Sequence, residues 1–302
     1  MTTSAEADDA TAAAVGPTLP PSPQQQPAST QDPQDEDECV LCCYPLPLNL
    51  AESLYKECCG EVICWGCIIA QKRTLIIGTN VKKPIKGSKE EHLEFMTILY
   101  SEQIMVCPFC RYDVPENEQE RLKRLWDRID EYNDRKAMNK IGLDYMKGDH
   151  GLSKNLKKAE ELLKRSYDLG NPSAAVNLSV LHRDHVPDEA RMTQYTEEGA
   201  RRGDVNCMNA LAIRAAQSGN QEEAKRQFMT AACSGHEEAM QNLMKLYRHK
   251  LLSKEALATT LRTHKAAIDN VKSEAREYAN RYNKFREKKM VELRGNRSHV
   301  AE

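Results

Sequence analysis

The stretch KECCGEVICWGC, residues 56–67, carries four cysteines in a short segment and decides how this part of the chain folds. Outward from it stand two further pairs, Cys39-Val-Leu-Cys42 and Cys107-Pro-Phe-Cys110. A gap of two residues lets one turn present two thiolates to a single ion, and a structural zinc ion takes four ligands. The spacing therefore predicts two zinc ions within residues 38–114. The predicted ligands are Cys39, Cys42, Cys58, Cys59, Cys64, Cys67, Cys107 and Cys110.

The cysteine count and the charge balance bound the class of protein. Eleven cysteines are an odd number, and disulfides do not persist in a reducing compartment, so metal binding is favoured over a disulfide framework. Cys207 and Cys233 stand apart and are expected to be small buried residues. The first thirty residues lack an apolar signal core, and no apolar run of membrane-spanning length occurs. We expect a cytoplasmic or nuclear protein without a membrane partner.

Nucleic acid is a disfavoured partner on the same grounds. The formal net charge is −2, so no global positive field exists to hold a polyanion. Residues 38–114 also lack the interleaved basic and aromatic residues that such binding uses. The basic stretch Lys284 to Arg294 is interleaved with Glu287 and Glu292, which favours a solvated helix face.

The chain divides into four segments by composition, and the fold class that they indicate is mainly α. Residues 1–37 are rich in Ala, Pro, Gln and acid, and are expected to form a disordered tail. Residues 38–114 are expected to form the small zinc finger. Residues 117–250 carry apolar residues at helical spacing, with Asn117 as a cap, and are expected to form an α-solenoid of helix pairs. Residues 251–302 are expected to form a helical cap and tail, starting at a weak cap, Ser253.

Residues 140–250 repeat at the length of one helix-turn-helix unit. Glycines recur at intervals of 33 and 32 residues: Gly170, Gly203 and Gly235. A small residue follows four positions later, and a leucine eight positions later: Ala174, Cys207 and Ala239, and Leu178, Leu211 and Leu243. Alanines recur at 31 and 34: Ala159, Ala190 and Ala224. The pattern predicts left-handed helix ends, close helix contacts and an inter-helix core, in that order. After Leu251 the predicted capping face comprises Leu257, Leu261, Ile268 and Val271.

The first repeat resembles the Sel-1-like repeat, a relative of the tetratricopeptide repeat. The matching residues are Ile141-Gly142, Tyr145, Gly148, Gly151-Leu152, Asn155, Lys158-Ala159 and Gly170-Asn171. The second and third units, at about 174–206 and 207–238, keep the glycine, alanine and leucine positions. The resemblance implies antiparallel helix pairs with a concave surface for a protein substrate or adaptor.

The order and spacing of the cysteine pairs resemble a RING finger of the all-cysteine variant. The resemblance implies crossed sites, with Cys39, Cys42, Cys64 and Cys67 on one ion and Cys58, Cys59, Cys107 and Cys110 on the other. Glu61 stands where a RING finger usually has histidine, and Cys59 takes over that ligand position. Cys58 is then the third ligand in a turn that Gly60 would allow, with Cys43 or His92 as the reserve. Between Cys67 and Cys107 we expect a helix over about 68–77 and a second element near 92–100.

A zinc ion held by four thiolates has no open coordination position and cannot activate water. The resemblance instead implies a ubiquitin-protein transferase without a catalytic residue, which docks a ubiquitin-conjugating enzyme and orients its thioester. It nominates Leu41, Pro108 and Arg111 for that docking. The bulky apolar residue that often follows the sixth ligand is here Gln71, with Ile68, Ile69 and Trp65 near it. The alternative is a non-catalytic zinc-binding scaffold for protein–protein interaction.

Overall fold

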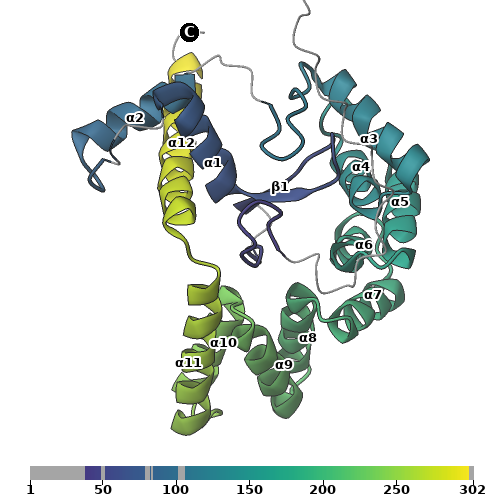
Figure 1. Ribbon diagram of the computed structural model, residues 1–302. Coiled ribbons are helices and arrows are strands. Elements are labelled where there is room, and N and C mark those ends of the chain that lie inside the picture. Colours follow the sequence, from purple (N-terminus) through teal and green to yellow (C-terminus); the bar gives the residue numbers. More distant parts are fainter. Residues whose placement is uncertain (1–37, 49–51, 79–81, 83, 101–105, 299–302) are drawn as a thin grey trace, which may run out of the picture.

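The computed structural model describes residues 38–48, 52–78, 82, 84–100 and 106–298. Within these residues the protein is mainly helical, as expected (Figure 1). The predicted disordered tail, residues 1–37, lies outside the described residues. No helix in the described part of the chain combines the length and apolarity needed to cross a bilayer.

The cysteine-rich segment, residues 38–114, is called the finger below. It is built on a short hairpin and two helices. Strands β1 (Ser53–Tyr55) and β2 (Val62–Cys64) pair antiparallel, with Leu54 opposite Ile63. Helix α1 (Trp65–Ile77) follows β2 without a break and so begins one turn before the predicted 68–77. Helix α2 (Lys89–Tyr100) contains the predicted second element. The Ser88 hydroxyl accepts a hydrogen bond from the Glu91 amide at its start.

The rest of the chain after Asn117 forms helices joined by short turns. Asn117 caps the first of them, accepting from the Glu120 amide at 2.9 Å, and Ser253 caps α11, both as predicted. The helices are α3 (Glu118–Tyr132), α4 (Arg135–Lys147), α5 (Leu156–Asp168), α6 (Pro172–Asp184), α7 (Glu189–Arg201), α8 (Val205–Gln217), α9 (Gln221–Cys233), α10 (Glu237–Arg248), α11 (Lys254–Asn270) and α12 (Glu274–Ser298).

Helix caps show where the repeat unit lies. The N-caps of α5, α7 and α9 are Asn155, Asp188 and Asn220, and those of α6, α8 and α10 are Asn171, Asp204 and His236. Both series advance by 33 and then 32 residues, the intervals of the three glycines. Those glycines are left-handed, with φ of 84°, 93° and 95° at Gly170, Gly203 and Gly235. The predicted solenoid of helix pairs is thus confirmed.

The core uses most, but not all, of the predicted repeat positions. Ala174, Cys207 and Ala239 are buried, as are Leu178 and Leu243, while Leu211 is half-buried. The prediction that Ala190 matches Ala159 and Ala224 was wrong: Ala190 is exposed, whereas the other two are buried. Four residues after their N-caps, α5 and α9 place Ala159 and Ala224, and α7 places Met192. The cap therefore sets the register, and the alanine spacing of 31 residues was coincidental.

The chain after Leu251 forms two helices with different neighbours. Helix α11 packs on α9 and α10 and buries Thr260 and His264, whereas the predicted Leu261 is 42% exposed. Helix α12 leaves the solenoid and packs against α1 and α2, as Figure 1 shows. Tyr278 and Tyr282 of α12 join Phe95 of α2 in one buried cluster. The finger thus acquires part of its core from the far end of the chain.

Candidate metal centre

The first cluster of sulfurs joins the start of the finger to the start of α1. Cys39 and Cys42 come from a tight turn, Cys64 from the end of β2 and Cys67 from the first turn of α1. Their four Sγ atoms all lie within 4.8 Å of one another. The Cys39–Cys67 distance is 3.9 Å and the Cys42–Cys64 distance is 3.8 Å.

The second cluster joins the hairpin turn to the end of the finger. It brings together Cys58 and Cys59, between β1 and β2, with Cys107 and Cys110. The Cys59–Cys107 sulfurs are 4.0 Å apart and the Cys58–Cys110 sulfurs 3.3 Å apart. The structure therefore brings together the eight cysteines that the spacing predicts, in the two sets of four that the resemblance implies.

The distances and the donor atoms fit a tetrahedral metal ion. Ligands at ~2.3 Å from zinc lie about 3.8 Å from each other, which is close to three of the four sulfur–sulfur distances above. All eight cysteines are free thiols, so no disulfide competes for them. Thiolates are soft ligands that select zinc or a similar ion, and a carboxylate-preferring ion is excluded by the donor set. Both clusters could hold a metal ion.

Two turns of the same design present the flanking pairs. Each first cysteine donates its amide to the carbonyl five residues on, Cys39 to Tyr44 at 2.9 Å and Cys107 to Tyr112 at 2.7 Å. Each also accepts at its carbonyl from the amide four residues on, that of Cys43 or Arg111. Cys43 and Arg111 adopt left-handed conformations, with φ of 54° and 62°. These bonds close the turn so that both thiols point to one side.

The turn between β1 and β2 has the same hydrogen-bond pattern as the two flanking turns, but one of its two cysteines stands at a different position. The Lys56 amide donates to the Glu61 carbonyl at 2.8 Å, and the Gly60 amide donates to the Lys56 carbonyl at 2.8 Å. Gly60 takes the left-handed position, with φ of 78°. Cys59 therefore corresponds to Cys42, while Lys56 stands where Cys39 would be, and Cys58 supplies the missing sulfur. Adjacent ligands are possible here because Gly60 adopts the left-handed conformation, and neither cysteine has a positive φ.

The reserve ligands are placed elsewhere. Cys43 is exposed and belongs to neither cluster. His92 lies on α2, where its ring packs edge-on against Phe285 at 5.0 Å between centroids. Cys207 is buried among the repeats, as expected, whereas Cys233 is only half-buried.

The close packing of the thiols shifts their pKa values in opposite directions within each cluster. Hydrogen bonding with Cys64 and Cys67 lowers the pKa of Cys39 far below its usual range, and hydrogen bonding with Cys58 does the same for Cys107. Hydrogen bonding with Cys107 raises the pKa of Cys58 to about 12. The Cys64 amide also donates to the Cys39 sulfur at 3.4 Å. A metal ion binds thiolates, so each cluster contains one sulfur already suited to lose its proton.

The residues nominated for docking lie in or directly after the two flanking turns. Leu41 is 38% exposed, Pro108 is half-buried and Arg111 is exposed. The candidates on α1 are less available. Ile68 and Ile69 are buried, and the Gln71 amide donates to the Val106 carbonyl at 3.2 Å.

Trp65 and Arg276 connect the finger to α12. Trp65 is half-buried, with the Arg286 guanidinium 5.5 Å from its ring centroid. Arg276 donates from Nη2 toward the Cys42 sulfur at 3.7 Å. Sequence reasoning missed Arg276, because no local pattern marks a residue that lies 234 positions from its partner.

Comparison with known proteins matches no family model and no curated protein. Among solved structures, the chain is similar to a Sel1 repeat protein from Oxalobacter formigenes, with 22% identity and a TM-score of 0.44. The match covers 53% of this chain and 65% of that one. A protective antigen of uropathogenic Escherichia coli strains, described as displaying an SLR fold, matches with 15% identity and a TM-score of 0.40. That match covers 56% of this chain and 40% of the antigen.

Proposed function

We propose that the protein is a RING-type ubiquitin ligase with two structural zinc ions. In this proposal the finger docks a ubiquitin-conjugating enzyme, and the Sel-1-like helix pairs recruit a protein substrate or adaptor. The observation that carries the proposal is the interleaving of the cysteine clusters. The first and third pairs along the chain share one cluster, and the second and fourth share the other.

Zinc would supply rigidity to the finger and no chemistry of its own. Four thiolates fill the coordination sphere, which leaves no position for water or substrate. The two crossed centres would tie the hairpin, both flanking turns and α1 into one unit. Catalysis would then consist of holding the carrier's thioester in a reactive orientation, without a covalent step on this chain.

The docking surface would comprise Leu41, Pro108 and Arg111. Leu41 lies between the first two ligands, and an exposed apolar side chain there would enter a groove of the carrier. The left-handed conformation of Arg111 ends the last turn, and its side chain is exposed. A planar guanidinium can bond two acceptors at once, which suits a residue that bridges a carrier and its ubiquitin.

The hairpin is fastened to the beginning of the helical array. The Tyr55 hydroxyl donates to Asp134 Oδ2 at 2.7 Å, and the Arg128 guanidinium contacts the same oxygen at 2.7 Å. Asp134 also caps α4, accepting from the Lys136 amide at 2.8 Å. Burial raises the pKa of Tyr55 well above its usual value, which keeps the hydroxyl protonated as a donor. A substrate on the array would therefore be held at a defined distance from the carrier.

The non-catalytic scaffold is the second candidate, and one observation favours it. Active RING fingers often carry a bulky apolar residue at the position of Gln71. Here the side-chain amide of Gln71 donates a hydrogen bond to the Val106 carbonyl. Leu75, one turn further along α1, is exposed and could replace that contact. The two candidates differ in whether a loaded carrier is discharged.

Autoubiquitination with a panel of conjugating enzymes tests the proposal. We expect ubiquitin conjugates with at least one carrier, and a loss of about tenfold or more in Leu41→Ala and in Arg111→Ala, since hot-spot residues contribute about 2 kcal/mol or more. Leu93→Ala, an exposed leucine on α2, is the matched control and should leave the rate unchanged. A parent protein that holds two zinc ions and is inactive with every carrier would support the scaffold instead.

A further inference from the structure

Arg276 lies in the first turn of α12 and reaches the first cysteine cluster from the far end of the chain. Its Nη1 donates to the Pro45 carbonyl at 2.7 Å and to the Val271 carbonyl at 2.8 Å. Its Nη2 donates to the Tyr44 carbonyl at 3.3 Å and toward the Cys42 sulfur at 3.7 Å. The residue is 5% exposed. The guanidinium thus clasps the turn that presents Cys39 and Cys42.

The approach of α12 depends on a glycine between two ligands. A Cβ on Gly66 would lie 2.8 Å from Arg276 Cγ and 2.9 Å from its backbone nitrogen. Gly66 stands between Cys64 and Cys67 of the same cluster. The cluster is therefore bordered on one side by the backbone of α12 itself.

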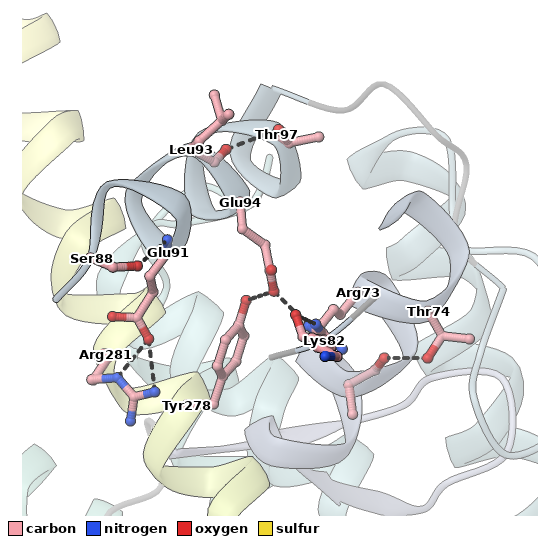
Figure 2. Close-up of polar contacts among 11 residues, drawn as sticks. Arg73, Thr74, Lys82, Ser88, Glu91, Leu93, Glu94, Thr97, Tyr278 and Arg281 are labelled. Carbon is pink, nitrogen blue, oxygen red and sulfur yellow. Dashed lines mark hydrogen bonds and ion pairs between the residues drawn. The ribbon is translucent and has the colours of Figure 1, made fainter. Parts of the chain in front are cut away.

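The rest of α12 is held by buried polar contacts, which Figure 2 shows. Arg281 forms an ion pair with Glu91 at 2.8 Å, and Glu91 is almost wholly buried on α2. Glu94 accepts from the Tyr278 hydroxyl and forms an ion pair with Arg73 of α1 at 2.6 Å. Breaking such buried pairs is costly, since it leaves a charge without a partner. Helix α12 therefore has contacts with α1 and α2 in addition to those of Arg276.

A dipositive ion with four thiolates carries a net charge of two minus. A buried guanidinium beside one of these sulfurs offsets part of that charge at a site where water is largely excluded. Hydrogen bonds to ligand atoms also fix their orientation, and loss of such outer contacts typically lowers metal affinity about 10- to 100-fold. Arg276 has the position and the charge for this role at the Cys42 sulfur.

We infer that Arg276 is a positioning residue for the first metal centre, so that zinc binding there and docking of α12 stabilise each other. The inference rests on the zinc centres of the proposed function and does not depend on ligase activity. It makes one of the two centres sensitive to the C-terminal helix. Since coupling between binding events is reciprocal, occupancy of that centre should in turn hold α12 in place.

Zinc release to a chromophoric chelator tests the inference on the full chain. In Arg276→Met we expect one of the two zinc ions to leave about tenfold faster than in the parent, while the other is unchanged. Arg276→Lys keeps the charge but not the planar guanidinium, so its zinc release rate should lie between those of the parent and of Arg276→Met. Arg281→Met is the comparison variant, because Arg281 holds α12 to Glu91 and does not contact the cluster. It acts only through the docking of α12, so it should speed release of that zinc ion clearly less than Arg276→Met does.

Amide hydrogen exchange tests the reciprocal effect, that of the first metal centre on the docking of α12. Cys42→Ser, which disables the first centre, should speed amide exchange in α12, whereas Cys110→Ser, which disables the second, should not. Far-UV circular dichroism checks that the repeats stay folded. Zinc release that is accelerated equally in Arg276→Met and Arg281→Met, or is not accelerated in Arg276→Met, would overturn the inference. Neither result would contradict the proposed zinc centres. A folded parent that binds no zinc would overturn the proposed centres themselves.

Discussion

Three residues with positive φ close the three cysteine turns, and only one of them is glycine. Cys43 and Arg111 accept the left-handed conformation at a cost of roughly 1–2 kcal/mol each. Gly60 is the exception because a side chain there would collide with the Arg128 guanidinium. That guanidinium is itself held by Asp134. The glycine thus serves both the turn and the contact between finger and helices.

At the residue scale we predict that Gly60→Ala destabilises the protein by more than its backbone conformation alone requires. Gly151 has nearly the same φ, 79° against 78°, and a Cβ there would meet nothing within 4 Å. Gly151→Ala should therefore cost only about 1 kcal/mol, and Gly60→Ala about 1–3 kcal/mol more because of the collision. Urea unfolding measures both. Equal losses would mean that Arg128 moves aside freely.

At the scale of elements, the N-cap of α4 also anchors the hairpin. Asp134 uses one carboxylate oxygen for the helix amides and the other for Tyr55 and Arg128. Asp188 caps α7 in the same way but has only a surface contact with Arg191. The two aspartates thus separate the effect of a cap from that of an anchor.

We predict that Asp188→Ala costs about 1 kcal/mol, the usual loss for a helix cap. Asp134→Ala should cost about 3 kcal/mol or more, since it also leaves the half-buried Arg128 guanidinium without its carboxylate partner. Asp134→Asn retains the cap and should fall between them. Chemical denaturation of the three variants provides the test. A loss in Asp134→Ala no larger than in Asp188→Ala would show that the hairpin is not anchored there.

At the scale of the molecule, the chain closes on itself. Helices α3 to α11 form an arc around β1, and α12 returns to α1 (Figure 1). At the start of the arc Tyr55 contacts Asp134, and near its end a Cβ on Gly235 would lie 3.8 Å from Leu48. The finger is therefore held at the start of the array and by the final helix, and Leu48 lies close to Gly235 near the other end.

We predict that removal of metal separates the behaviour of these parts. Strong chelation should abolish amide protection in α1 and in α12, because both depend on the finger. Protection in α5 to α9 should persist, because each repeat is stabilised by its neighbours. Hydrogen exchange with and without chelator measures this. Full protection of α1 after complete metal removal would contradict the proposal that metal stabilises the finger.

Most of the candidate site and the repeat period could be predicted from the sequence. Ligand turns depend on residues three or four apart, and helix caps on residues two or three apart, so both leave a local pattern. Asn117 and Ser253 were recognisable as caps for this reason. The exposure of Ala190 and Leu261 could not be predicted, since it depends on how one helix is rotated against the next.

The sequence by itself determined the cysteine pairs, the mainly helical fold class and the repeat length, because each is encoded by local spacing or periodicity in the chain, while the crossed grouping of the pairs was an expectation from the family resemblance. Only the tertiary structure decided that α12 completes the finger and that Arg276 reaches Cys42. Contacts across 234 residues arise when the whole array has closed, and the aromatic and charged side chains that make them look locally like any amphipathic helix.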